Sequence, residues 1–190
     1  MEPLTIDIGC GTDKHPDARY GVDILPLPGV DFVCNLESGT LPFAESSVDV
    51  VYTRHTLEHI ANLEHILREI VRIVKPGGRV NVTVPHFSNT LGYSDYTHKR
   101  FFGYYTFDYF SSERNKYWGV PRYTNDIVFK ITSKRLCFKN LSLLGPLCEW
   151  IFNSGQLLAY AYESKLAWLL PCFEIEFRLV VEKTPNGTVP

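Results

Sequence analysis

Apolar residues along the chain follow two different periods. Five short segments, rich in β-branched residues and bounded by glycine, proline, aspartate or asparagine, are typical of buried β-strands. These segments span residues 4–9, 20–24, 30–35, 48–53 and 79–85. Between the last two, apolar residues recur at steps of three and four from Leu57 to Val74, which predicts an α-helix with one buried face. The sequence KPGG at 75–78 predicts the end of that helix, because proline cannot continue its hydrogen bonds.

A strand, a helix and a strand joined by short connections form a parallel βαβ unit, and a series of such units predicts a doubly wound α/β sheet. Ligands bind such sheets at the carboxyl ends of the strands. Near the C-terminus, residues 126–140 and 173–183 predict two more strands that close the sheet edge as an antiparallel pair. The apolar stretch between them, residues 156–170, predicts a buried or capping helix and is where we expect any self-association.

Composition is consistent with one domain over residues 1–190, because 45% hydrophobic residues suffice for a single core. The net charge of -2 gives no bulk electrostatic reason to expect nucleic acid, so a small molecule is the expected partner. An odd number of cysteines without a C-x-x-C pair argues against a disulfide framework, and the N-terminus lacks a signal-peptide pattern. We therefore expect a cytoplasmic protein. No membrane span is expected, since Glu163 and Lys165 interrupt the longest apolar run.

A glycine-containing loop, DIGCGT at 7–12, follows the first predicted strand. Gly9 and Gly11 permit a tight turn and a close approach of a ligand to the backbone. Asp23, at the end of the second predicted strand, is placed to accept hydrogen bonds from both hydroxyls of a ribose. The third glycine of the dinucleotide fingerprint is absent, and the interval from Gly11 to Asp23 is only 12 residues. The pattern therefore favours a nucleoside without a pyrophosphate and disfavours an NAD-dependent oxidoreductase.

Four stretches resemble the successive motifs of the class I S-adenosylmethionine-dependent methyltransferases, especially their small bacterial and archaeal branch: IDIGCGT, GVDI, SSVDVVYTRHTLEHI and EIVRIVKPGGRVNVTVPH. The resemblance implies a Rossmann-like sheet of seven strands in the order 3-2-1-4-5-7-6, with the last strand antiparallel, and S-adenosylmethionine as the cofactor. Position by position, it implies a methionine site at Asp7, Gly9 and Gly11, ribose binding by Asp23, adenine binding by Asn35 and Leu36, and contact near the methyl group by Thr53 and His55.

The chain departs from this family pattern in two ways. An aspartate is common where Asn35 stands, and since an amide can still accept from the adenine amino group, we expect weaker selectivity but retained binding. The leading helix usual in the family is not seen before the first strand, and the helix between strands one and two is nearly absent. One side of the cofactor pocket is therefore expected to be open or filled by another subunit. A non-catalytic S-adenosylmethionine- or nucleoside-binding protein stays an alternative.

The longest insertion, residues 86–126, follows the fifth predicted strand at the site end of the sheet. Half of the aromatic residues lie within 87–123, which predicts either a cap with stacking surfaces for an acceptor or a local core that packs the insertion onto the sheet. His86, Asp95 and His98 are candidate general bases for an acceptor that must lose a proton. The expected reaction is methyl transfer to a small molecule, most simply at a hydroxyl or an amine, with release of S-adenosylhomocysteine.

The stretch RHTLEHI, residues 54–60, has the H-x-x-E-H order of a zinc-peptidase motif read in the inverted direction. Histidines four residues apart on one helical face can share a zinc ion. A peptidase site would also need both histidines well inside a helix and a third ligand on another one, and no downstream motif announces it. We therefore expect no metal, and we expect His55 to lie near the methyl group.

Overall fold

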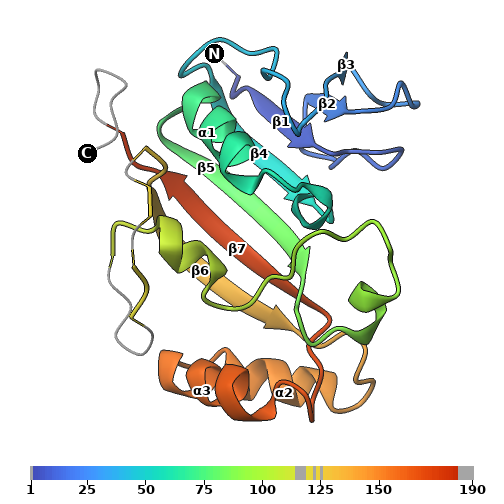
Figure 1. Cartoon of the computed structure of the whole chain (residues 1–190), viewed down its shortest axis with the longest axis vertical. Coiled ribbons are helices and arrows are strands. Elements are labelled where there is room, and N and C mark those ends of the chain that lie inside the picture. The colour runs from blue at the N-terminus through green and yellow to red at the C-terminus, as the bar shows by residue number, and fades with distance from the viewer. Residues whose placement is uncertain (1, 114–118, 122, 125, 184–190) are drawn as a thin grey trace.

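The computed structural model describes residues 2–113, 119–121, 123, 124 and 126–183 and contains a seven-stranded sheet (Figure 1). The order β3-β2-β1-β4-β5-β7-β6 is the one that the family resemblance implies, so the predicted α/β fold is confirmed. The strands are β1 (Thr5–Ile8), β2 (Tyr20–Asp23), β3 (Phe32–Val33), β4 (Val48–Arg54), β5 (Val74–Pro85), β6 (Phe129–Cys137) and β7 (Glu174–Val181).

Parallel pairing brings the carboxyl ends of β1 to β5 to one edge of the sheet. β1 pairs with β2 and β4, β2 pairs with β3, and β4 pairs with β5. β7 runs antiparallel between β5 and β6, which confirms the predicted closing pair. The loops that follow β1 to β4 therefore lie near one another, although they are spread over the first third of the chain.

Helix α1 joins β4 to β5 and starts later than the apolar pattern predicts. It spans Leu63–Ile73, because Asn62 caps it: the Asn62 side chain accepts a hydrogen bond from the backbone N–H of His65 at 3.2 Å. Residues Leu57–His59 form a separate 3₁₀ turn, η1, and Ile60 is extended. α1 lies over β4 and β5 (Figure 1), with its apolar side buried as predicted.

The predicted helix stop, KPGG at 75–78, lies within β5. α1 ends just before it, and the regular pairing of β5 with β4 resumes at Arg79, so these residues form a bulge in the strand. Gly77 has a φ of +76°, which glycine adopts at little cost. The proline and glycines thus end the helix as expected, and the chain turns directly into the next strand.

Loops make the other connections between parallel strands. Residues 9–19, 24–31 and 34–47 are all described, and they contain no α-helix. The β3-β2-β1 end of the sheet therefore has no crossover helix of its own, in agreement with the nearly absent helix expected between the first two strands.

The insertion after β5 carries two 3₁₀ turns, η2 (Thr90–Tyr93) and η3 (Thr106–Phe110). Phe107 of η3 is fully buried, and its ring centroid lies 4.7 Å from that of Phe177 in β7. At least this part of the insertion packs into the main core. For η3, this favours the predicted local core over a cap with stacking surfaces for an acceptor. Positions 114–118, 122 and 125 of the predicted insertion lie outside the described residues.

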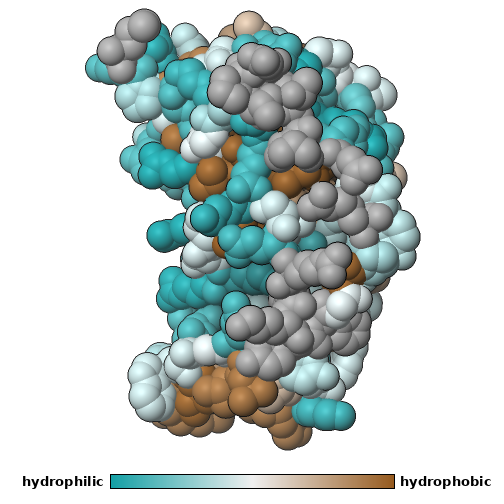
Figure 2. All heavy atoms as spheres, turned by 90° about the vertical axis from the view of Figure 1, so that its left-hand side faces the viewer, coloured by the Kyte–Doolittle hydropathy of each residue, from teal (hydrophilic) through white to brown (hydrophobic). Residues whose placement is uncertain are grey.

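The segment between β6 and β7 is more exposed than predicted. It contains α2 (Gly145–Phe152), α3 (Gln156–Ala161) and a π-helical turn, η4 (Tyr162–Leu166). Its inner side is buried, but large apolar side chains face solvent: Leu143, Leu144, Leu147, Trp150, Leu157, Trp168 and Leu169. Figure 2 shows this apolar surface gathered at the α2–α3 end of the molecule. Within the described residues, no helix has the length and apolar character needed to span a bilayer. Self-association through this surface stays a prediction.

Replacing Phe177 with alanine is expected to lower the free energy of unfolding by about 3 to 5 kcal/mol, because truncating a fully buried aromatic ring leaves a cavity. Urea denaturation followed by circular dichroism measures the loss. The matched control is Phe101→Ala, since Phe101 is 53% exposed, and its cost should stay below about 1 kcal/mol. Equal losses in the two variants would contradict the packing of η3 against β7.

Candidate functional site

A pocket of about 310 Å³ lies at the carboxyl edge of the parallel strands. It is lined by residues that follow β1, β2, β3 and β4 and by one residue of the insertion: Gly9, Asp23, Ile24, Asn35, Leu36, Glu37, His55, Thr56, His59, Ile60 and Lys99. Five of the predicted cofactor residues are among them, namely Gly9, Asp23, Asn35, Leu36 and His55. Positions that are distant in the sequence therefore meet in one cavity.

Asp23 ends β2 with its carboxylate held by two backbone donors. The N–H of Gly11 donates to Asp23 Oδ2 at 2.9 Å, and the N–H of Leu25 donates to Asp23 Oδ1 at 3.1 Å. Each carboxylate oxygen has a further lone pair that can accept from a ligand hydroxyl. A carboxylate fixed in this way on the wall of a pocket is suited to bind a pair of neighbouring hydroxyls.

The two glycines after β1 are required for different reasons. Both have left-handed backbone conformations, with φ of +73° at Gly9 and +53° at Gly11. A Cβ atom at position 9 would lie 2.1 Å from Thr56 Oγ1, whereas one at position 11 would meet nothing within 4 Å. Gly9 is therefore needed for close contact with the loop after β4.

Asp7, Gly11 and Thr53 are predicted cofactor residues that do not line the pocket. Asp7 is buried; its Oδ2 accepts a hydrogen bond from the backbone N–H of His15 at 2.8 Å, and its Oδ1 has no hydrogen-bond partner among the described residues. Burial raises the pKa of Asp7, although the hydrogen bond from His15 and the charge of Arg54 oppose this.

The loop after β3 is tied to the insertion by an ion pair. Lys99 Nζ lies 2.6 Å from Glu37 Oε1, and the backbone N–H groups of Ala61 and Asn62 also donate to the Glu37 carboxylate. The hydrogen bond from Ala61 and the one from Lys99 lower the pKa of Glu37 to about 2. In the same loop, Asn35 Oδ1 accepts from the N–H of Glu37 at 2.9 Å, which orients the amide beside the pocket.

His55 follows β4 in a left-handed conformation, with φ of +49°, and its side chain is about half exposed. His55 Nε2 lies 3.1 Å from Glu174 Oε2, and His55 Nδ1 lies 3.7 Å from Glu58 Oε1. Glu174 and then Glu58 raise the pKa of His55 to about 9. Burial acts against ionisation of Glu174, but hydrogen bonds from His55 and Lys139 lower its pKa. At neutral pH, His55 is therefore an imidazolium and not a base.

This geometry excludes the zinc-peptidase arrangement. His55 precedes η1 in a left-handed conformation, and His59 is the last residue of that short turn. The two imidazoles therefore do not share one face of an α-helix, which a peptidase site would need.

None of the three candidate bases lines the pocket. His86 is buried, with Nε2 2.9 Å from Glu163 Oε2 and Nδ1 2.7 Å from Ser88 Oγ. Asp95 and His98 share a turn of the insertion, where Asp95 Oδ2 lies 3.6 Å from His98 Nε2. A catalytic role for these residues stays a prediction.

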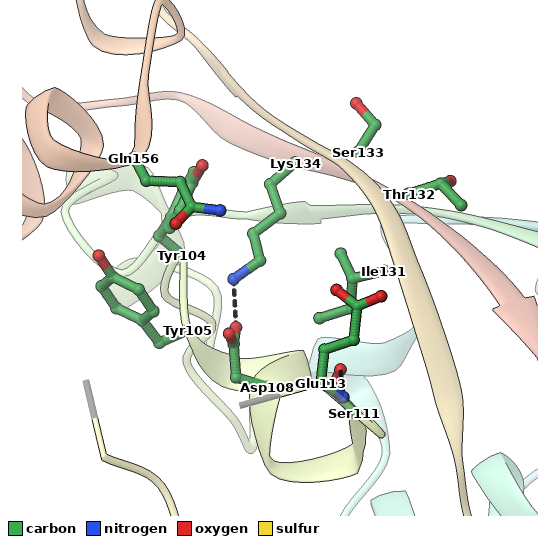
Figure 3. A pocket seen from close by; sticks show the side chains of 10 residues that line it. All are labelled: Tyr104, Tyr105, Asp108, Ser111, Glu113, Ile131, Thr132, Ser133, Lys134 and Gln156. Atoms are coloured by element: carbon green, nitrogen blue, oxygen red, sulfur yellow. Dashed lines mark hydrogen bonds and ion pairs between the residues drawn. The ribbon is translucent and has the colours of Figure 1, made fainter. Parts of the chain in front are cut away.

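A second cavity, of about 280 Å³, lies between the insertion and β6 (Figure 3). Lys134 of β6 points into it and pairs with Asp108 of η3, and the rings of Tyr104 and Tyr105 lie beside the ammonium group. Burial lowers the pKa of Lys134, although the charge of Asp108 opposes this. The cavity shares no lining residue with the pocket at the carboxyl edge, and its ion pair fastens the insertion to the sheet.

Sequence patterns missed several polar residues of the site. Glu174 bonds to His55 because β7 lies beside β5, and no local signal near residue 174 announces that contact. The ion pair of Glu37 with Lys99 likewise depends on how the insertion returns over the sheet. Thr56 lies inside a stretch that carries the family resemblance, so its position beside Gly9 is the one contact that the motifs were suited to reveal.

Comparisons with curated proteins identify methyltransferases. A family model described as a methyltransferase domain matches residues 6–82. A demethylmenaquinone methyltransferase of Renibacterium salmoninarum is 30% identical over 93 residues, which cover 42% of this chain and 39% of that protein. A sterol 4-C-methyltransferase of Caenorhabditis elegans is 44% identical over 95 residues, which cover 39% of this chain and 28% of that protein. The matched part is thus less than half the length of either relative.

Solved structures share the fold over almost the whole chain. The YcgJ protein of Bacillus subtilis matches with a TM-score of 0.60 at 16% identity, covering 96% of this chain and 93% of that one. A phosphoethanolamine N-methyltransferase of Haemonchus contortus, in complex with phosphomonomethylethanolamine and S-adenosylhomocysteine, matches with a TM-score of 0.55 at 17% identity, covering 97% of this chain and 50% of that one. At such identities the likeness establishes the fold alone. The domain model that matches residues 6–82, together with the strand order, supports a class I S-adenosylmethionine-dependent methyltransferase.

Proposed function

We propose that the protein binds S-adenosylmethionine in the pocket at the carboxyl edge of the sheet and transfers the methyl group to a hydroxyl or an amine of a small molecule. The observation that carries the proposal is the Asp23 carboxylate, held by the N–H groups of Gly11 and Leu25 on the wall of that pocket. When bound, S-adenosylmethionine would supply a methyl group activated by its sulfonium. The family match over residues 6–82, which contains this carboxylate, supports the same ligand.

Each predicted cofactor residue has a distinct proposed role. Asp23 accepts from the ribose hydroxyls, and Asn35 with Leu36 forms the adenine wall. Asp7, Gly9 and Gly11 surround the methionine part, and Asp7 Oδ1 is buried without a hydrogen-bond partner among the described residues. Thr53 and His55 lie toward the methyl group. These roles follow the family resemblance, and they agree with five of these residues lining one cavity.

The proposed chemistry depends on positioning more than on a built-in base. Methyl transfer requires the acceptor to approach the methyl group in line with the departing sulfur, in a site that excludes water. His55 is a cation at neutral pH, so it would orient an electron-rich acceptor and would not remove its proton. His86, Asp95 and His98 stay the candidate bases, and their absence from the pocket lining supports the emphasis on positioning.

Two alternative functions are an NAD-dependent oxidoreductase and a non-catalytic S-adenosylmethionine-binding protein. An NAD-dependent oxidoreductase is disfavoured, because residues 9–19, all described, form no helix whose N-terminus would hold a pyrophosphate. A non-catalytic S-adenosylmethionine-binding protein is the second alternative, and it is consistent with the lack of a helix in residues 9–19. Binding of S-adenosylhomocysteine without turnover on a broad panel of hydroxyl and amine acceptors would favour this second alternative.

Asp23→Ala is expected to weaken binding of S-adenosylhomocysteine about 10- to 150-fold, because losing hydrogen bonds to a charged group costs about 1.5 to 3 kcal/mol. Isothermal titration calorimetry with S-adenosylmethionine, S-adenosylhomocysteine and NAD measures the affinities, and NAD is expected not to bind. Asp17→Ala is the matched control, since Asp17 is exposed and outside the pocket. Unchanged affinity in Asp23→Ala would refute the ribose assignment, and no binding of either sulfur ligand at millimolar concentration would refute the function.

The His55 ion pairs are expected to stabilise the fold more at pH 6 than at pH 10. Because the pKa of folded His55 is raised from 6.5 to about 9, the stabilisation is fully present below pH 6.5 and is lost as the pH rises through about 9. His55→Asn keeps a residue that tolerates the left-handed backbone and removes the imidazolium. Urea denaturation of both proteins across this pH range measures the difference. A stability difference that does not change with pH would contradict the charged state assigned to His55.

A further inference from the structure

A cluster of metal-ligating side chains lies beside the proposed cofactor pocket, and the function proposed above needs no metal. The carboxylate of Glu58 and the imidazoles of His59 and His98 offer ligand atoms that all lie within 4.8 Å of one another. Glu58 and His59 belong to η1, which follows β4, whereas His98 belongs to the insertion. The cluster therefore joins two segments that are distant in the sequence.

Glu58 is a buried carboxylate without hydrogen bonds. Its residue is 1% exposed, and neither side-chain oxygen accepts a hydrogen bond from any residue that the structure describes. His55 balances part of its charge, but the two nearest atoms of this pair are 3.7 Å apart, beyond hydrogen-bond distance. A buried carboxylate with empty lone pairs is costly, so this side chain points to a further positive partner.

The two imidazoles are oriented by a turn of the insertion. Thr97 Oγ1 lies 2.9 Å from His59 Nδ1, and Asp95 Oδ2 lies 3.6 Å from His98 Nε2. The Thr97 hydroxyl also donates to Asp95 Oδ1 at 2.6 Å. His59 therefore has an outer partner at Nδ1, which leaves Nε2 for coordination, as is usual around metal-binding histidines.

We propose that Glu58, His59 and His98 bind a divalent transition-metal ion, with zinc as the ion best suited to the donors. Two imidazoles and one carboxylate bind zinc at about 2.0 to 2.2 Å, and a water completes the tetrahedron. Ligand atoms around such an ion lie roughly 3.3 Å apart, so small side-chain rotations close the cluster. The proposal departs from the expectation of no metal: it retains two residues of the H-x-x-E-H stretch and takes the third ligand from the insertion instead of His55.

The metal would fasten the insertion to the wall of the cofactor pocket. The backbone N–H groups of Lys99 and Arg100 donate to the carbonyl oxygen of Glu58 at 2.8 and 3.1 Å. These hydrogen bonds already hold the insertion against η1. His59 and Lys99 also line the pocket. An ion held by side chains from both segments adds a crosslink at this junction, and its role is structural and independent of whether the pocket binds S-adenosylmethionine.

Metal binding is tested on the full chain after treatment with EDTA and dialysis. Isothermal titration with Zn²⁺ is expected to show one ion per chain, and the visible spectrum of the Co²⁺-substituted protein is expected to show nitrogen coordination. Glu58→Gln and His98→Ala are each expected to abolish stoichiometric binding. Thr97→Val, which removes the outer partner of His59, is expected to weaken it about 10- to 100-fold.

His15→Ala is the matched control, because the His15 ring stacks on Tyr52 and lies outside the cluster, so this variant should bind Zn²⁺ like the parent. Circular dichroism verifies that each variant is folded. Absence of stoichiometric uptake by the parent, or equal uptake by parent, Glu58→Gln and His98→Ala, would overturn the proposal. S-adenosylhomocysteine binding measured in EDTA separates the zinc site from the proposed function. If the protein binds S-adenosylhomocysteine but takes up no zinc, only the metal-site proposal is refuted.

Discussion

The parallel pairing of β1 with both β2 and β4 is the constraint on which the site depends. It places the loop after β1 between the ends of β2 and β4. On one side, the backbone N–H of Gly11 donates to the carboxylate of Asp23, and on the other side Gly9 packs against Thr56. None of these contacts is local in sequence. A strand order that separated β1 from either neighbour would leave the same residues without a common cavity.

The fold, and the grouping of Gly9, Asp23, Asn35, Leu36 and His55 around one pocket, could be predicted from the sequence because short-range patterns mark the strands and the loops that follow them. β-branched segments mark strands, and Gly9, Gly11 and Asp23 follow strands that meet at one edge. The start of α1 was predicted too early, because the apolar spacing runs through η1 without a break and the cap at Asn62 outweighs it.

The surroundings of His55 and of the candidate base His86 were not predictable in the same way, because they depend on contacts between segments that are distant in the sequence. His86 has the residue type of a base, yet Glu163 and Ser88 occupy both of its nitrogens. Glu174 gives His55 its positive charge from a strand near the other end of the chain. Residue type and spacing identify candidates for such roles, but long-range packing decides which of them are accessible and which protonation state they have.

The close contact of Gly9 with Thr56 couples the loop after β1 to the loop after β4. A larger residue at position 9 has no room unless the loop after β4 moves away, and any such movement carries the backbone that leads to His55 with it. Sequence change in the two loops is therefore coupled, and positions 9 and 56 should vary together among relatives that keep this geometry. Gly9 thus limits which changes the loop after β1 can accept without moving the loop that carries His55.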